Sequence, residues 1–201
     1  MWNRTSPSQM GLFELLRISM TMYKAKQDPE EFLQFLLAIK DRKLRIIVEI
    51  GTASAGTLFL WSALGQYDAH LISVDIASSE YASYVWGVML RDLQTLSVIR
   101  GDSKSDTTYD EVVESLDGRE VDLLYIDGSH WYEDVHADYL KYRGLVRPGG
   151  IIVLHDIGIR GREDIGVWKL WEEIKGDYRY DEYINSDPDS ICGLGILYVG
   201  G

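Results

Sequence analysis

Five acidic residues, each at the end of a short apolar run or just after it, divide most of this 201-residue chain into units of similar length. They are Glu49, Asp75, Asp102, Asp127 and Asp156, spaced 25 to 29 residues apart, which is about the length of one strand and one helix. The alternation predicts βαβ units on a parallel sheet, an α/β fold. Because right-handed crossovers bring the carboxyl ends of parallel strands to one edge, where ligands bind, we expect these carboxylates to share a crevice. The alternative for any one of them is a helix cap.

The apolar pattern places the other elements. Strands are predicted at 46–50, 71–76, 96–100, 121–126 and 151–155, then two mutually antiparallel strands at 178–183 and 193–199. Helices are predicted from Gly56 and at 80–93, 109–116, 131–143 and 166–174, with a turn at 148–150.

Residues 1–43 are predicted to form two more helices, the second capped by Asp28 with Glu31 placed for a capping box. We expect a single domain over 1–201, with this helical extension and a core from residue 44. Packing is the expected role of the extension, and a lid or a dimer surface is the alternative.

The turn after the first strand is built from small residues. Gly51, Ala53 and Gly56 follow the spacing G-x-A-x-x-G, which suits a tight turn and a helix N-terminus facing a ligand. Many nucleotide-binding proteins share this spacing, so it does not identify the ligand. Glu49, at the mouth of the turn, would repel a pyrophosphate and attract a cation. This favours S-adenosylmethionine over NAD, and an ordinary turn with a surface glutamate is the alternative.

Each later carboxylate has a chemical interpretation. Asp75 can accept hydrogen bonds from both hydroxyls of a ribose. Asp102 can accept one from an adenine amino group, or cap the following helix. Asp127 and Asp156 should end neighbouring strands, where they can share a divalent cation or flank a substrate as base and orienting group.

Histidines accompany the last two aspartates. His130 follows Asp127 by three residues, and His155 directly precedes Asp156. Histidine can remove a proton from a hydroxyl near neutral pH or bind a metal. His155 and Asp156 can both face the site only if the strand ends there, because consecutive strand residues point to opposite faces. His70 and His136 have no such neighbours and are predicted to lie at the surface.

Composition argues against several partners. The net charge of −12 disfavours nucleic acid and anionic membranes. Cys192 is the only cysteine, which excludes an intrachain disulfide and agrees with a reducing cytoplasm. Residues 1–8 lack the pattern of a secretory signal. We therefore expect a cytoplasmic protein with a small-molecule partner, and a homo-oligomer is compatible with the sequence.

Five ordered segments carry a family resemblance: residues 48–56, 73–76, 101–103, 122–130 and 147–156. Together they resemble the class I S-adenosylmethionine-dependent methyltransferases. Within this class, the segments IDGSH (126–130) and LHD (154–156) are similar to the branch of macrolide-sugar O-methyltransferases and cephalosporin hydroxylase-like proteins. The resemblance covers residues 44–200.

The resemblance implies a Rossmann-like, seven-stranded, mostly parallel sheet of order 3-2-1-4-5-7-6, with helices on both faces and the last strand antiparallel. It implies that S-adenosylmethionine lies against ten residues: Glu49, Gly51, Thr52, Ser54, Gly56, Asp75, Ile76, Asp102, Ser103 and Asp127. The branch typically holds Mg²⁺ at the positions of Asp127, His155 and Asp156, and His130 matches its general base. Where the branch has Glu this chain has His155, and imidazole suits Mn²⁺, Fe²⁺ or Zn²⁺ better than Mg²⁺.

The predicted function is methyl transfer from S-adenosylmethionine to an oxygen of a small hydroxylated substrate, with or without a divalent metal (Mg, Mn or Fe). His130 would act as base, while Asp127 and Asp156 would hold the oxygen. Three aromatic residues are interpreted as acceptor-pocket or core residues: Trp131, Tyr132 and Trp168. The alternatives are a nicotinamide-dependent oxidoreductase and a non-catalytic module with the same fold.

Overall fold

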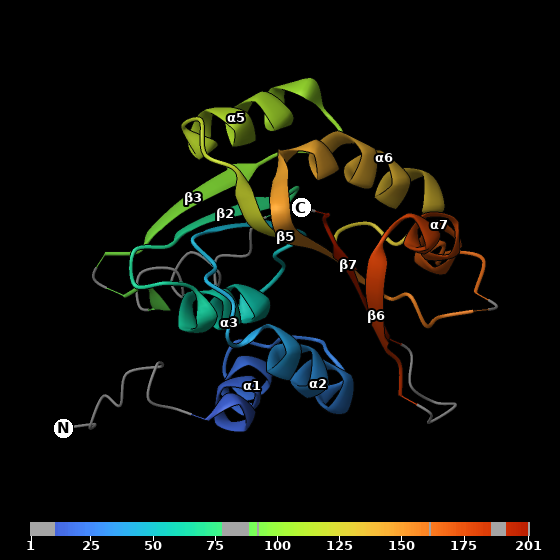
Figure 1. The fold of residues 1–201 in the computed structure, drawn as a ribbon, viewed down its shortest axis with the longest axis horizontal. Helices are drawn as coiled ribbons and strands as arrows, with labels where there is room; N and C mark the ends of the chain where they lie inside the picture. Colours follow the sequence, from blue (N-terminus) through green and yellow to red (C-terminus); the bar gives the residue numbers. More distant parts are fainter. Residues whose placement is uncertain (1–10, 78–88, 92, 161, 186–191, 201) are drawn as a thin grey trace.

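A central sheet lies between two layers of helices in the computed structural model, which describes residues 11–77, 89–91, 93–160, 162–185 and 192–200 (Figure 1). The strands are β1 (Ile46–Ile50), β2 (His70–Asp75), β3 (Thr95–Arg100), β4 (Val121–Ile126), β5 (Val146–His155), β6 (Arg179–Tyr183) and β7 (Leu194–Tyr198). Their order is β3-β2-β1-β4-β5-β7-β6. The first five pair in parallel, and β7 is antiparallel to both its neighbours. The predicted order is therefore confirmed.

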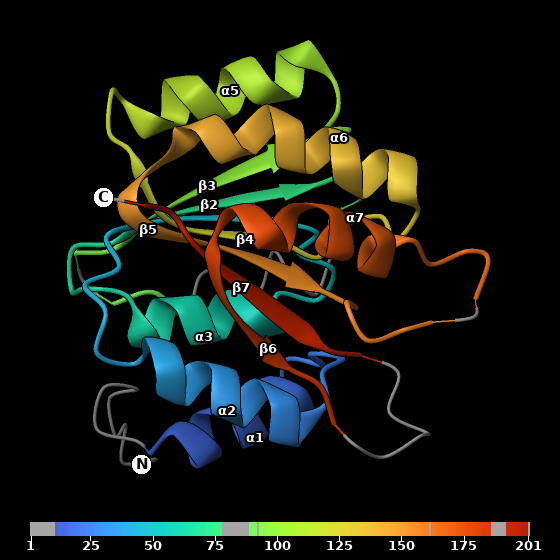
Figure 2. The same ribbon diagram turned by 45° about the vertical axis from the view of Figure 1, so that its right-hand side comes forward.

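The helices divide between the two faces of the sheet (Figure 2). One face is covered by α1 (Leu12–Thr21), α2 (Pro29–Ile39) and α3 (Gly56–Leu64). The other is covered by α5 (Asp106–Leu116), α6 (Tyr132–Tyr142) and α7 (Val167–Ile174). Short 3-10 turns, η2 (Arg143–Leu145) and η3 (Lys175–Asp177), follow α6 and α7. Most of the helix predicted at 80–93 falls outside the described residues.

Strand β1 is buried along its whole length, as its β-branched run predicts. Ile47 packs in the layer of α1, α2 and α3, whereas Val48 and Ile50 pack in the layer of α5, α6 and α7. The side chains alternate between the faces because the strand is regular. Packing against both helix layers therefore holds the carboxyl end of β1, where the turn begins, in place.

The N-terminal extension is part of the core and also reaches the far end of the sheet. Asp28 Oδ1 accepts from the backbone nitrogens of Glu30 and Glu31, so the predicted cap is confirmed. The Glu31 carboxylate accepts from the backbone nitrogens of Asn185, at 2.6 Å, and Gly193, at 2.7 Å. Helix α2 therefore ties the end of β6 to the start of β7.

Two local predictions are wrong. The segment 148–150 lies inside β5 instead of forming a turn, because Gly149 N donates to Val199 O and Val199 N donates to Gly150 O. His70 is 9% exposed instead of lying at the surface. Its ring nitrogens contact the hydroxyls of Thr95 and Ser115, which satisfy a buried imidazole. Among the described helices, none combines the length and the apolar composition needed to cross a bilayer.

Candidate active site

A cavity of about 820 Å³ opens at the carboxyl ends of the parallel strands, a size typical of small-molecule sites. Four of the five predicted strand-end carboxylates line it: Asp75, Asp102, Asp127 and Asp156. The prediction of a shared crevice is confirmed for these four. The lining contains seven aspartates against four lysines and arginines and two histidines, His130 and His155. Aspartates outnumber all the basic side chains together, so the crevice is acidic.

Glu49 does not lie at the mouth of this crevice, and its predicted placement is wrong. Its side chain is fully buried, and Trp61 Nε1 donates to its Oε1 at 2.8 Å. Burial raises the pKa of Glu49 to about 7, although hydrogen bonds from Thr57, Trp61 and Thr52 oppose this shift. The physical reason is strand alternation: Glu49 still belongs to β1 and points into the α3 layer.

The turn after β1 is held by Asp75. The Asp75 Oδ2 atom accepts from Thr52 N at 2.8 Å and from Ala53 N at 2.7 Å. Gly51 has φ +89°, and a Cβ at this position would lie 2.0 Å from Asp127 O. Only glycine fits, because the turn passes directly against the end of β4. The other predicted cofactor residues of this region, Thr52, Ser54, Gly56 and Ile76, also line the cavity.

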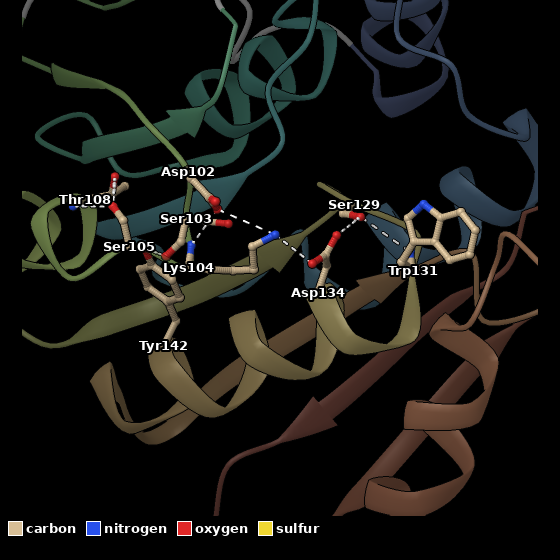
Figure 3. A network of polar contacts seen from close by, with 9 residues as sticks. All are labelled: Asp102, Ser103, Lys104, Ser105, Thr108, Ser129, Trp131, Asp134 and Tyr142. Atoms are coloured by element: carbon tan, nitrogen blue, oxygen red, sulfur yellow. Dashed lines mark hydrogen bonds and ion pairs between the residues drawn. The ribbon is translucent and has the colours of Figure 1, made fainter.

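Polar contacts connect the turn after β3 to the start of α6 along the next part of the cavity wall (Figure 3). Lys104 Nζ lies 2.6 Å from Asp134 Oδ1 and 3.8 Å from Asp102 Oδ1. Ser129 Oγ donates to the other oxygen of Asp134. Asp102 is not the cap of α5, because Ser105 Oγ accepts from the backbone of that helix's first turn. The cap alternative for Asp102 is therefore wrong. Asp102 and Ser103 both line the cavity, and their contact with a cofactor stays a prediction.

Asp138, one turn beyond Asp134 on α6, is a crevice residue that was not predicted from the sequence. It lines the cavity and is 1% exposed. Burial raises its pKa to about 6, although Ser103 and Lys104 act in the opposite direction. Asp134 and Asp138 are four residues apart, so they lie on one face of the helix. This spacing in the sequence could have predicted that Asp138 lies beside Asp134.

Four charged side chains meet where β4 and β5 end. Strand β5 ends at His155, and Asp156 has φ +65°. Both side chains therefore reach the crevice, as the prediction required. His155 Nδ1 lies 3.1 Å from Asp127 Oδ1 and 3.0 Å from Asp156 Oδ1. His130 Nδ1 lies 2.7 Å from Asp156 Oδ2.

The mutual contacts shift the pKa of each partner. The hydrogen bond to Asp156 raises the pKa of His130. Burial acts to lower the pKa of His155, but the charge of Asp127 and the contacts with both aspartates hold it well above its usual value. Burial acts to raise the pKa of Asp156, but both histidines hold it well below the usual range. The cluster is thus a set of compensating charges.

Two further crevice residues come from distant parts of the chain. Gln27, between α1 and α2, donates from Nε2 to Asp127 Oδ2 at 3.2 Å. Cys192, before β7, also lines the cavity. Nothing in the local sequence indicates either contact. The aromatic residues considered for the acceptor pocket, Trp131, Tyr132 and Trp168, are not among its lining residues, which include Ile159 and Ile165.

The topology and the sequence agree on one family. An antiparallel β7 between β5 and β6 differs from the 3-2-1-4-5-6 order of dinucleotide-binding folds. A sequence profile described as a methyltransferase domain matches residues 48–157, which is more than half of the chain. The chain belongs to this methyltransferase family. The topology therefore argues against the nicotinamide alternative. The predicted argument from Glu49 does not apply, because this residue is buried away from the crevice.

Solved structures share the methyltransferase fold at low sequence identity. The O-methyltransferase TomG from Streptomyces achromogenes, in complex with S-adenosylmethionine, is 17% identical with a TM-score of 0.65, covering 96% of this chain and 91% of TomG. The methyltransferase MycE, in complex with Mg, S-adenosylhomocysteine and mycinamycin VI, is 17% identical with a TM-score of 0.62, covering 94% of this chain and 54% of MycE.

One curated relative matches in sequence. The uncharacterized protein y4gI of Sinorhizobium fredii is 29% identical over 170 residues, which are 78% of this methyltransferase and 17% of y4gI. The chain therefore spans about a sixth of the length of that relative.

Two overlapping groups of side chains in the methyltransferase have the spacing of metal ligands. They are His155, Asp156 and Cys192, and Asp127, His130 and Asp156, with ligand atoms within 4.8 Å of one another in each group. Mg²⁺ prefers oxygen ligands, whereas each group contains a nitrogen or a sulfur donor. The donor sets do not fit Mg²⁺, and they fit a transition metal.

Proposed function

We propose that the protein transfers a methyl group from S-adenosylmethionine to an oxygen of a small hydroxylated substrate. The observation that carries this proposal is the acidic crevice, in whose wall seven aspartates outnumber the six lysine, arginine and histidine side chains. S-adenosylmethionine has a sulfonium and an ammonium but no phosphate, so such a wall attracts it and repels the pyrophosphate of NAD. TomG and MycE, which share the fold, were solved with S-adenosylmethionine and S-adenosylhomocysteine, and this agrees with the proposal.

The donor would lie across the turn after β1. In this placement the ribose hydroxyls donate to Asp75, and the adenine amino group donates to Asp102. Asp75 already holds the turn through Oδ2, so one carboxylate would fix both the cradle and its ligand.

The acceptor would lie at the ends of β4 and β5. The His130 Nδ1 atom is engaged by Asp156, which leaves Nε2 to take the hydroxyl proton. The acceptor oxygen then bonds to the methyl carbon as the carbon–sulfur bond breaks, and S-adenosylhomocysteine leaves. Asp127 would orient the acceptor oxygen, and the gain comes from alignment of donor and acceptor. A divalent transition metal held by side chains at the ends of β4 and β5, among them Asp156, would stabilise the developing alkoxide when bound.

Calorimetry followed by a turnover assay tests the proposal. We expect heat of binding for S-adenosylmethionine and none for NAD. We then expect release of S-adenosylhomocysteine with at least one member of a panel of sugars, phenols and polyketide alcohols. NAD binding without S-adenosylmethionine binding would overturn the proposal. Donor binding without release for any acceptor would indicate the non-catalytic module.

A further inference from the structure

The thiol of Cys192 is held beside His155 by the connections around it. Gly158 N donates to Cys192 O at 2.9 Å, so the segment after β5 runs against the segment before β7. Gly193, with φ +102°, turns the chain here, and Glu31 of α2 accepts from its backbone nitrogen. These contacts place the Cys192 sulfur within 4.8 Å of ligand atoms of His155 and Asp156.

His155 is a buried imidazole whose hydrogen-bonding groups are not satisfied. It is 5% exposed, and neither ring nitrogen has a hydrogen-bond partner among the described residues. The contacts of Nδ1 with Asp127 and Asp156, at 3.1 and 3.0 Å, are close in distance but lack hydrogen-bond geometry. An unsatisfied buried polar group is costly. A ligand that binds imidazole nitrogen would remove this cost.

The two candidate metal groups differ in how deeply their histidine is buried. In the group with His130, that histidine's Nδ1 already contacts Asp156 Oδ2 at 2.7 Å, and its side chain is 46% exposed. In the other group, the His155 side chain is 6% exposed and faces the second oxygen of Asp156. One oxygen of Asp156 is thus directed to each histidine. The set of His155, Oδ1 of Asp156 and Cys192 is the more buried of the two, and it contains the thiol.

We propose that His155, Asp156 and Cys192 bind one Zn²⁺ ion. Cysteine, histidine and aspartate are the protein ligands of zinc, and three of them with one open position are typical of catalytic zinc sites. All three side chains line the crevice, so an ion can reach them. The inference deepens the proposed function, since it names the metal of the same crevice, but zinc binding does not require methyl transfer.

The experiment uses the full untagged chain, stripped of metal with a chelator and then titrated with Zn²⁺ or Co²⁺. We expect one Zn²⁺ per chain by mass spectrometry of the dialysed protein. We also expect the Co²⁺ form to show the near-ultraviolet charge-transfer band of a cobalt–thiolate bond, because Cys192 is the only thiol. A Co²⁺ spectrum without this band, or a chain that retains no Zn²⁺, would overturn the inference.

Variants separate the site from adventitious binding. Cys192→Ser should abolish the thiolate band and weaken Zn²⁺ binding at least about tenfold. His136→Gln is the control, since His136 is outside both candidate groups and its loss should leave Zn²⁺ affinity unchanged. Equal Zn²⁺ affinity in Cys192→Ser and the wild type would contradict the inference. Calorimetry with S-adenosylmethionine on the same samples shows separately whether the proposed function holds.

Discussion

The two ends of the crevice are built in different ways. At the end formed by β1, β2 and β3, carboxylates accept from backbone nitrogens of nearby turns, as Asp75 does from Thr52 and Ala53. At the end formed by β4 and β5, charged side chains contact one another, as in the pair of His130 and Asp156. In the first case a carboxylate holds the backbone of a turn, and in the second side chains hold one another. Both sets of contacts join residues that are distant in the sequence.

The sharpest test of this division is His130→Ala. If His130 is the base of the acceptor end, kcat should fall roughly 10²- to 10⁴-fold. The affinity for S-adenosylmethionine should stay unchanged, because no contact links His130 to the turn after β1 among the described hydrogen bonds. Steady-state kinetics and calorimetry measure the two quantities, with His136→Ala as the control. A parallel loss of affinity would show that the ends are not separate, and full activity would refute the base assignment.

Asp75→Ala probes the cofactor end. The change removes the proposed ribose acceptor and also the acceptor of Thr52 N and Ala53 N. We expect the affinity for S-adenosylmethionine to fall more than about 100-fold, roughly 3 kcal/mol. Asp110→Ala, at an exposed acid of α5, should leave binding intact. A wild-type dissociation constant in Asp75→Ala would exclude the proposed donor placement.

Glu49→Gln tests whether that residue belongs to the core and not to the crevice. The folded-state pKa of Glu49 is about 7, above the ordinary glutamate value of 4.5, so the folded protein holds the proton more tightly than the unfolded chain. The wild type should lose stability as the pH rises from about 4.5 to 7, by at most about 3 kcal/mol. The variant should lack this loss, so its stability relative to the wild type should be higher at pH 8 than at pH 4.5. Urea unfolding at pH 4.5 and pH 8 measures the free energy of unfolding of both proteins. A lower affinity of the variant for S-adenosylmethionine would instead indicate that Glu49 belongs to the crevice.

The smallest expected effect belongs to Gln27→Ala. Loss of one hydrogen bond to Asp127 corresponds to about 1 kcal/mol, or roughly a fivefold decrease in kcat/KM. Gln34→Ala, on the exposed face of α2, is the matched control. If both variants behave like the wild type, the extension supports the acceptor end only through packing.

The parts that could be predicted are those with a local physical signal. The β-branched run of β1 and the cap at Asp28 predict elements because their effect extends over a few residues. The bounds of β1 are predicted correctly, but Glu49 is misplaced because strand alternation turns its side chain toward α3 and away from the crevice. Gln27 and Cys192 could not be predicted, since their partners lie far away in the sequence. His70 is buried because hydroxyls of β3 and α5 happen to surround it.

The close approach of Gly51 to the carbonyl of Asp127 has a consequence for how reactants meet. Closely packed backbone resists sliding, so the proposed donor and acceptor positions would share one rigid floor. In that arrangement the fold itself would set the distance between sulfur and oxygen, and local flexing of the floor would not accommodate an acceptor that is too short or too long.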